Sequence, residues 1–280
     1  MQNEIVYLNG QYLPLSDAKI SVMDRGFLFG DGVYEVIPAY AGKLFRLEGH
    51  LERLGNSLKS IRLQNPHTPE QWRNLLTKLL KDGVDQSVYL QITRGAAPKR
   101  DHAFPAHIVP TVFAMVSNIN PHSDENTGLK AISLEDSRWK LCDTKAITLL
   151  ANVLLRQEAI ENGCAEAILF KEDYLTEGSA SNVFAVINDI LMTPPKGPAI
   201  LPGITRDVIL EIARNKNIPC SEQAISKTNL KAASEIWVTS STREIIPIVE
   251  LDGEIIGNGK PGSVWKTFHK LFQDYKQLLR

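Results

Sequence analysis

Strand-like and helix-like segments alternate along the whole chain, and this alternation constrains its fold more than any other feature. In the first 120 residues, period-two patterns and turn residues predict hairpins at 4–15 and 33–47 and single strands at 87–94 and 108–116. Helical periodicity predicts helices over 50–61 and 69–81, the second of them after Thr68 as N-cap. Elements mixed in this way predict an α/β or α+β fold.

A polar segment near the middle divides the chain. Asn118–Gly128 reads NINPHSDENTG, contains a proline and shows no apolar period, as is typical of a linker. At 280 residues the chain is long enough for two modest domains. We therefore expect a small N-terminal α/β domain at 1–120 and a larger C-terminal domain at 121–280.

The second half carries strands and helices of its own. Apolar runs and alternation predict strands at 130–134, 166–170, 182–187, 190–193 and 231–238. Helical periodicity predicts helices at 146–162 and 206–215, and Thr205 is the expected N-cap of the latter.

Composition and charge exclude several classes of function. The formal net charge is −1, without long runs of like charge, so the surface is not built to attract nucleic acid or anionic membrane. We see no signal peptide and no apolar stretch of roughly 20 residues. Cys142, Cys164 and Cys220 form no CxxC pair, which favours a reducing compartment over a disulfide framework or a zinc site. We expect a soluble, cytoplasmic protein without a metal.

Lys145 is the first candidate for chemistry. It follows the stretch WKLCDT and directly precedes the predicted helix at 146–162. Taken alone, it could be a solvated lysine at a helix start. A lysine held at an element end beside apolar surface can also lose its proton more readily, which an imine-forming nucleophile requires.

Three further segments combine small, acidic or hydroxyl residues. Glu177–Asn182 (EGSASN) is either a small-residue turn or a place where a flat cofactor approaches a carboxylate. Leu201–Asp207 (LPGITRD) is either an ordinary helix start or a phosphate site built on free N–H groups. Thr239–Thr242 (TSST) is either a polar turn or a set of phosphate ligands.

The order and spacing of these segments resemble a known family signature. Glu177-x-Ser179-x-x-Asn182, then Leu191-x-Thr193, then Leu201-x-Gly203-Ile204-x-Arg206 is similar to the pattern of the class IV (fold-type IV) aminotransferases, which use pyridoxal 5′-phosphate (PLP). DRGFLFGDGVYE at 24–35 and HLERL at 50–54 resemble N-terminal hallmarks of the same family. The resemblance implies a fold-type IV enzyme of two domains, with the cofactor in the cleft between them.

Matching positions carry over the family's cofactor roles. Lys145 matches the catalytic Schiff-base lysine, and Glu177 matches the acid that pairs with the pyridinium nitrogen. Leu201 matches a residue packed against the cofactor ring. The positions that match phosphate ligands are Arg53, Ile204, Thr205, Ser240 and Ser241. Ala180 departs from the pattern, because a serine is expected there in the subgroup that this chain resembles most.

The loop around Arg100 indicates the subgroup. Arg100-x-His102 followed by Phe-Pro resembles the carboxylate-binding element of D-amino-acid aminotransferases, and Tyr34 matches the tyrosine that shares this task. The loop could instead be flexible and solvated. It is one residue longer than expected, so Lys99 could face the substrate in place of Arg100. The resemblance further implies a homodimer in which this loop reaches the neighbouring subunit's site.

These residues together predict PLP-dependent transamination between a D-amino acid and a 2-oxo acid, either 2-oxoglutarate or pyruvate, in a ping-pong scheme. Three alternatives stay open within the same family. They are an L-selective branched-chain aminotransferase, an aminodeoxychorismate lyase, and a homologue without catalytic activity.

Overall fold

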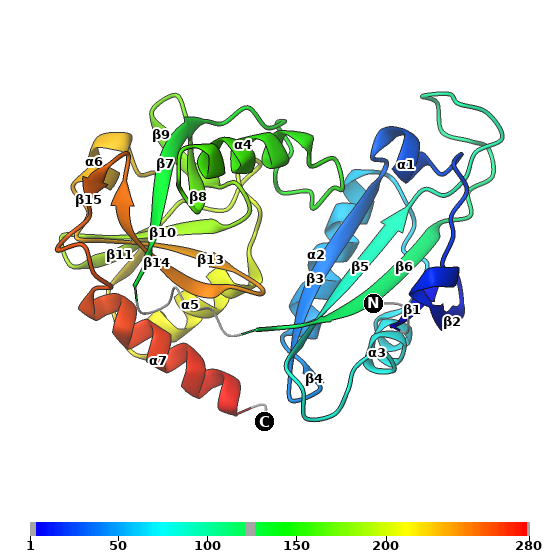
Figure 1. The fold of residues 1–280 in the computed structure, drawn as a ribbon, viewed down its shortest axis with the longest axis horizontal. Helices are drawn as coiled ribbons and strands as arrows, with labels where there is room; N and C mark the ends of the chain where they lie inside the picture. Colours follow the sequence, from blue (N-terminus) through cyan, green and yellow to red (C-terminus); the bar gives the residue numbers. More distant parts are fainter. Residues whose placement is uncertain (1–3, 121–126, 279–280) are drawn as a thin grey trace. The chain divides into compact units, whose positions relative to one another are not determined.

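The structure is a computed structural model that describes residues 4–120 and 127–278, and its contacts divide the chain into two compact units. The first contains residues up to Asn120 together with Thr144–Thr148, and the second contains the remaining described residues from Thr127 onward (Figure 1). Part of the expected linker, residues 121–126, lies outside the described residues. Residues 144–148 pack with the first unit although the sequence places them within 121–280, because their backbone pairs with a strand of that unit.

The first unit is built on a six-stranded sheet in which all neighbouring strands are antiparallel. Its order is β2-β1-β6-β5-β3-β4. The strands are β1 (Ile5–Leu8), β2 (Gln11–Pro14), β3 (Gly32–Tyr40), β4 (Lys43–Leu44), β5 (Gln86–Thr93) and β6 (Thr111–Asn118). Both predicted hairpins, β1-β2 and β3-β4, are present.

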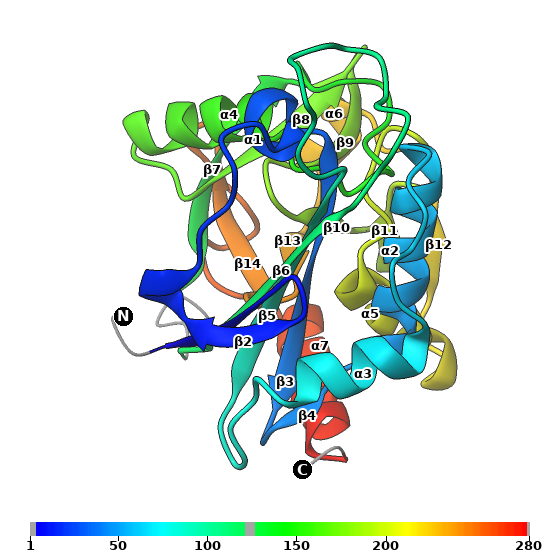
Figure 2. The ribbon, with the colours of Figure 1, turned by 90° about the vertical axis from the view of Figure 1, so that its right-hand side faces the viewer.

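Helices α2 (Leu47–Ser60) and α3 (Pro69–Thr77) cover this sheet (Figure 2). Their apolar side chains share one core with β3 and β5, in which Leu54 and Trp72 are fully buried. Thr68 is the N-cap of α3, as the sequence predicts, and it forms a reciprocal capping box with Gln71. Two short helical segments, η1 (Leu15–Asp17) and α1 (Arg25–Phe29), precede β3.

The second unit contains a nine-stranded mixed sheet. Its path is β12-β11-β10-β13-β14-β7-β8-β9, and β15 pairs with β14. The strands are β7 (Leu129–Glu135), β8 (Glu166–Lys171), β9 (Tyr174–Gly178), β10 (Asn182–Ile187), β11 (Ile190–Thr193), β12 (Cys220–Glu222), β13 (Glu235–Ser240), β14 (Glu244–Leu251) and β15 (Glu254–Ile255).

Four helices belong to the second unit: α4 (Leu150–Glu161), α5 (Ile204–Asn215), α6 (Lys227–Lys231) and α7 (Ser263–Gln277). Helix α4 packs on β7 and β8, whereas α5 and α7 lie together against β13 (Figure 1). The Trp237 ring of β13 lies 5.4 Å from that of Phe268 in α7. The mixed α/β fold expected from the sequence is confirmed. In the part of the chain that the structure describes, no helix is both long and apolar enough to cross a membrane.

Three predicted boundaries are wrong in an informative way. Helix α4 begins at Leu150 rather than at 146, because residues 146 and 147 pair with β3 instead of turning into a helix. The predicted strand 231–238 begins only at Glu235, because Ser226 caps the short helix α6 that precedes it. The predicted strand 108–116 begins at Thr111, after Pro110, whose nitrogen carries no hydrogen to donate to a sheet.

Candidate active site

Both units contain residues that the sequence singles out. The first unit holds Tyr34, Arg53, Arg100, His102 and Lys145. The second unit holds Glu177, Leu201, Ile204, Thr205, Ser240 and Ser241.

The backbone around Lys145 is tied to β3 and α2. The Lys145 N–H donates to Ser57 Oγ at 3.1 Å, and the Lys145 carbonyl oxygen accepts from the Tyr34 N–H at 3.0 Å. Two residues later, the Ile147 N–H donates to the Gly32 carbonyl oxygen at 3.1 Å. Lys145 is therefore not a helix-start lysine. It precedes an isolated bridge between Ala146 and Val33, on backbone that is hydrogen-bonded on both sides.

The Lys145 side chain is half-buried and lies against an aromatic ring. Its Nζ is 4.2 Å from the centre of the Tyr34 ring, within the range of a cation–π contact. Next to it, Thr144 Oγ1 is buried and has no hydrogen-bond partner among the described residues. Such an orphaned polar atom is uncommon in a protein interior and is what a bound polar group would satisfy.

Arg53 forms a buried cluster with Glu35 and His50. Arg53 Nε and Nη2 donate to the two Glu35 carboxylate oxygens at 2.8 and 2.7 Å, and His50 Nδ1 lies 2.8 Å from Glu35 Oε2. Burial alone would raise the pKa of Glu35, but Arg53 and then His50 outweigh it and lower that pKa to about 2. Glu35 is thus ionised and fixes the Arg53 guanidinium in one orientation.

His50, unlike Glu35, is uncharged in this cluster. Burial lowers the pKa of this imidazole below its ordinary value, so the ring is neutral near pH 7. With Nδ1 donating to the Glu35 carboxylate, Nε2 carries a lone pair. This Nε2 is buried and has no partner among residues 4–120 and 127–278. The cluster therefore presents an unused acceptor in the same unit as Lys145.

Arg100 and His102 both approach Phe29, the last residue of α1. The Arg100 guanidinium carbon lies 5.0 Å from the centre of the Phe29 ring, and the His102 ring lies 5.2 Å from it. Lys99 instead pairs with Asp101 at 2.9 Å and its side chain is 77% exposed. Within the described residues, no hydrogen bond joins Tyr34 to Arg100 or His102, and the ring of Tyr34 instead contacts Lys145.

In the second unit, Glu177 is held by three donors. It is the second-last residue of β9, and Asn182 begins β10. Arg138 Nη1 donates to Glu177 Oε1, while Asn182 Nδ2 and the Leu201 N–H each donate to Oε2 at 3.0 Å. Asn182 Nδ2 also donates to the Leu201 carbonyl oxygen at 2.9 Å. These bonds explain the spacing of the sequence pattern, because its glutamate, asparagine and leucine contact one another.

Desolvation dominates the electrostatics of Glu177. Only 5% of the residue is exposed, and burial raises the pKa of its carboxyl to about 7 although Arg138 acts to lower it. Arg138 is shared, since its Nε and Nη2 also bind Asp136 at 2.9 and 2.7 Å. A carboxylate offers about four acceptor sites, so Glu177 can accept from one further cationic donor.

The start of α5 has uncapped N–H groups. Gly203 is the N-cap and provides no capping side chain. The expected N-cap, Thr205, lies inside the helix, and its Oγ1 donates to the Ser240 carbonyl oxygen at 3.2 Å. A Cβ on Gly203 would lie 1.9 Å from Asn182 Oδ1, so only glycine allows the helix to begin there.

The Thr205–Ser240 bond brings the predicted phosphate positions of this unit together. Ile204 and Thr205 are the first residues of α5, and Ser240 and Ser241 follow at the end of β13. Thr239 Oγ1, beside them, is buried and finds no partner among the described residues. A helix start with unused N–H groups and hydroxyls nearby is suited to a phosphate dianion.

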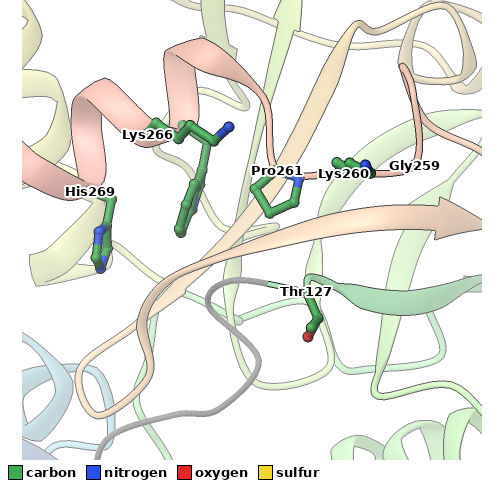
Figure 3. A pocket seen from close by; sticks show the side chains of 7 residues that line it. Thr127, Gly259, Lys260, Pro261, Lys266 and His269 are labelled. Carbon is green, nitrogen blue, oxygen red and sulfur yellow. The ribbon is translucent and has the colours of Figure 1, made fainter.

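A separate hollow of about 730 Å³ lies elsewhere in the second unit (Figure 3). It is lined by Trp265, Lys266 and His269 of α7, by the turn 259–261 and by Thr127. The lining includes none of the residues that the sequence singles out. We therefore do not place the active site there.

Comparisons with known proteins bear on the whole chain. Residues 32–251 match the model of the family described as amino-transferase class IV. Over 276 residues the chain is 40% identical to a protein named D-alanine aminotransferase from Staphylococcus epidermidis, and the match covers 97% of this chain and 98% of that protein. The chain belongs to the class IV aminotransferase family. Members of this family depend on PLP.

Solved structures of branched-chain amino acid aminotransferases have the same fold. A branched-chain amino acid aminotransferase from Escherichia coli has a TM-score of 0.88 and 26% identity, over 97% of this chain and 94% of that one. A T.th. branched-chain amino acid aminotransferase with pyridoxamine 5′-phosphate has a TM-score of 0.91 over 100% of this chain and 96% of that one. At 23% identity the latter likeness concerns the fold alone.

Two residues that orient predicted site residues were not identified from the sequence. Glu35 orients Arg53, and Arg138 binds Glu177. A lone glutamate inside the apolar alternation of 33–37 could have pointed to a buried ion pair. The partner of Arg138 could not be found in this way, because Glu177 lies far from it in the sequence.

Proposed function

We propose that this class IV aminotransferase transfers the amino group of a D-amino acid to a 2-oxo acid, using PLP. The observation that carries the proposal is the 40% identity, over 97% of the chain, to a D-alanine aminotransferase. A second relative with the same name, from Bacillus licheniformis, is 37% identical over 96% of both chains. The acceptor is 2-oxoglutarate or pyruvate.

The residues present fit the cofactor in charge, and the start of α5 and Thr239 offer hydrogen-bonding groups that are unused among the described residues. The phosphate would be held by Arg53 and by the groups at the α5 start and the β13 end: Ile204, Thr205, Ser240 and Ser241. The uncapped N–H groups of α5 and the orphaned Thr239 hydroxyl support this assignment. Glu177 would pair with the ring nitrogen, Leu201 would pack on the ring, and Lys145 would bind the aldehyde carbon.

When bound, PLP supplies a carbonyl that condenses with amines and a cationic ring that withdraws electrons from the substrate's Cα. Glu177 would keep the ring nitrogen protonated. Its pKa of about 7 would fall with a further cation beside it, so that its carboxyl group would be ionised and would stabilise the positive charge of the ring.

Lys145 is the general base in this proposal. Its free amine would take the Cα proton of the substrate and would hold that proton until it is returned later in the reaction. The Tyr34 ring, 4.2 Å from Nζ, stabilises the ammonium that proton removal creates. The anchored backbone of residues 145–147 keeps Nζ on one side of the substrate, so that one enantiomer presents its proton to it.

Recognition of the substrate carboxylate is assigned to Arg100 and His102, with Tyr34. A guanidinium binds a carboxylate through two parallel N–H donors, and the histidine and tyrosine add donors from the side. In this proposal the Arg100 loop acts in the site of the neighbouring subunit of a homodimer. The dimer and a cytoplasmic location stay predictions from the sequence.

One observation favours a second candidate function. The Escherichia coli structure with the same fold is a branched-chain amino acid aminotransferase. An L-selective enzyme would share the residues assigned to PLP but would not need the Arg100-x-His102 element.

Steady-state assays separate these possibilities. We expect the purified enzyme to turn over D-alanine with 2-oxoglutarate and to turn over L-leucine far more slowly. Activity on L-leucine alone would refute the proposal. Release of pyruvate from aminodeoxychorismate without an amino acceptor would indicate a lyase, and a protein without visible PLP absorbance would be a non-catalytic homologue.

A further inference from the structure

Arg25 is a buried arginine whose side chain ends at the loop that carries Arg100 and His102. Only 3% of it is exposed. Its Nη1 donates to the carbonyl oxygens of Asp101 and Ala103 at 2.5 and 3.3 Å, and its Nη2 donates to that of His102 at 3.2 Å. One guanidinium therefore binds three successive carbonyl groups of the loop, and charge-assisted bonds of this kind are stronger than neutral ones.

Asp31 fixes the guanidinium of Arg25 and also that of Arg94. Arg25 Nε donates to Asp31 Oδ2 at 2.8 Å, and Arg94 Nε and Nη2 donate to Oδ2 and Oδ1 at 2.8 and 2.9 Å. Arg94 in turn lies over the Phe104 ring, 3.7 Å from its centre. Burial alone would raise the pKa of Asp31, but the two arginines lower it, so the bridging carboxylate is ionised near neutral pH.

The ends of the loop, residues 96–110, are attached to the same short segment. The Ala97 N–H donates to the Met23 carbonyl oxygen at 3.2 Å. At the other end, Thr111 Oγ1 donates to the buried Asp24 carboxylate at 2.6 Å. The loop is thus held at both ends by residues 23–24 and near its middle by the side chain of the next residue, Arg25.

Fixed backbone and exposed side chains coexist in this loop. Arg100 and His102 are exposed, while the carbonyl groups of 101–103 are bound to a buried cation. Loops ordinarily open easily, because few buried contacts and few internal hydrogen bonds hold them. Here the ion cluster supplies those contacts without occupying either of the two side chains.

We propose that Arg25, held by Asp31, is a positioning residue that fixes the backbone of 101–103 and so presents Arg100 and His102 to the substrate carboxylate. This inference rests on the proposed function, in which these two side chains bind that carboxylate. In this proposal Arg25 acts through the loop backbone and is not itself a contact of the substrate or the cofactor. By ordering the loop beforehand, Arg25 lowers the conformational entropy that is lost when the carboxylate binds.

The first test measures the loop without reference to activity. Hydrogen exchange of the PLP-loaded protein is compared for wild type, Arg25→Met and a matched control, Arg73→Met, which removes an exposed arginine paired with Glu48. We expect Arg25→Met to speed exchange in peptides covering 98–109 by about tenfold or more, and Arg73→Met to leave them unchanged. Unchanged exchange in Arg25→Met would overturn the inference, whatever the enzyme's activity.

Arg25→Lys covers the case in which Arg25→Met fails to fold. Lysine keeps a cation beside Asp31, but a single ammonium cannot serve the carboxylate and three carbonyl groups with the geometry of a guanidinium. We expect this variant to fold and to show faster exchange confined to the loop. A lysine variant with wild-type exchange and a wild-type KM would overturn the inference.

The second test is a double-mutant cycle on KM. Arg25→Met should raise the KM for D-alanine and for 2-oxoglutarate about tenfold, with kcat and PLP affinity little changed. In an Arg100→Met background the same change should add little. Additive effects would show that Arg25 acts independently of Arg100 and would overturn the inference. An Arg100→Met enzyme with unchanged KM would refute the carboxylate role in the proposed function, and the inference with it.

Discussion

Lys145 Nζ lies 4.2 Å from the centre of the Tyr34 ring, and the Tyr34 N–H donates to the Lys145 carbonyl oxygen at 3.0 Å. A lysine from the segment 144–148 is thus fixed on a strand that the sequence places in another domain. Residues 144–148 pack with the first unit for this reason. The position of the proposed base depends on β3 as much as on the segment that carries it.

Replacing Lys145 by alanine should abolish transamination. The change removes the nucleophile and the proton carrier together, so we expect a loss of at least about 1,000-fold in kcat. Lys140→Ala, at an exposed lysine nearby, is the matched control and should retain wild-type turnover. Steady-state rates with D-alanine check this, and near-normal turnover of Lys145→Ala would rule out the assigned base.

Arg100→Ala should raise the KM for amino and oxo acids without releasing PLP. The expected increase is about tenfold or more, because a bidentate contact with the carboxylate is lost. Lys99→Ala, which removes an exposed lysine paired with Asp101, should change KM little. If the two variants behaved in the opposite way, Lys99 would be the residue that binds the carboxylate, as the longer loop allows. If PLP dissociated from Arg100→Ala, this arginine would belong to the cofactor site.

Glu177 should make the PLP-free protein less stable as pH rises from 4.5 to 7. Its pKa is about 7 in the folded chain and 4.5 ordinarily, so the folded state binds the proton more tightly and stability falls across that interval. The full effect corresponds to about 3 kcal/mol. Glu177→Gln lacks this titrating carboxyl group, so its stability should not show this dependence on pH.

Urea unfolding at pH 5 and pH 8 measures this effect as a difference between the two proteins. Comparison with Glu177→Gln cancels other groups that titrate in the interval, including His50, whose lowered pKa acts in the opposite direction. The glutamine variant should gain stability relative to wild type at pH 8. An equal difference at both pH values would contradict the raised pKa.

Glu35→Gln should destabilise the protein at pH 7, and the loss should shrink in acid. The pKa of Glu35 is lowered from 4.5 to about 2, so its contribution is present above pH 4.5 and disappears as pH falls through 2. That contribution is about 3 kcal/mol. Glu48→Gln, at an exposed glutamate, should cost no more than about 1 kcal/mol. A loss from Glu35→Gln that did not depend on pH would show that packing, rather than charge, explains it.

The fold was predictable where local chemistry decides it. Turn residues located the hairpins, and Thr68 as N-cap located the start of α3. Helix α7 was not assigned, although Trp265, Phe268 and Phe272 recur at helical spacing and are buried on one face. The start of α4 could not be predicted, because the pairing of residue 146 with β3 is a long-range contact that overrides helical periodicity.

Some residues of the candidate site could be predicted from the sequence, and others could not. The gapped pattern from Glu177 to Arg206 was visible because several of its positions make contacts that depend on the residue type. Gly203 leaves room for Asn182, and Asn182 binds both Glu177 and Leu201. The partners that orient the site were not visible, since the buried ion pairs Glu35–Arg53 and Arg138–Glu177 join residues that are distant in sequence.

The half-reaction with single enantiomers tests the central claim most directly. The PLP-loaded enzyme is mixed with one amino acid and no oxo acid, and loss of the cofactor's visible absorbance is followed for a panel of D- and L-amino acids. The proposal predicts rapid loss with D-alanine and other D-amino acids and little change with L-leucine. Rapid loss with L-leucine and none with any D-amino acid would contradict it.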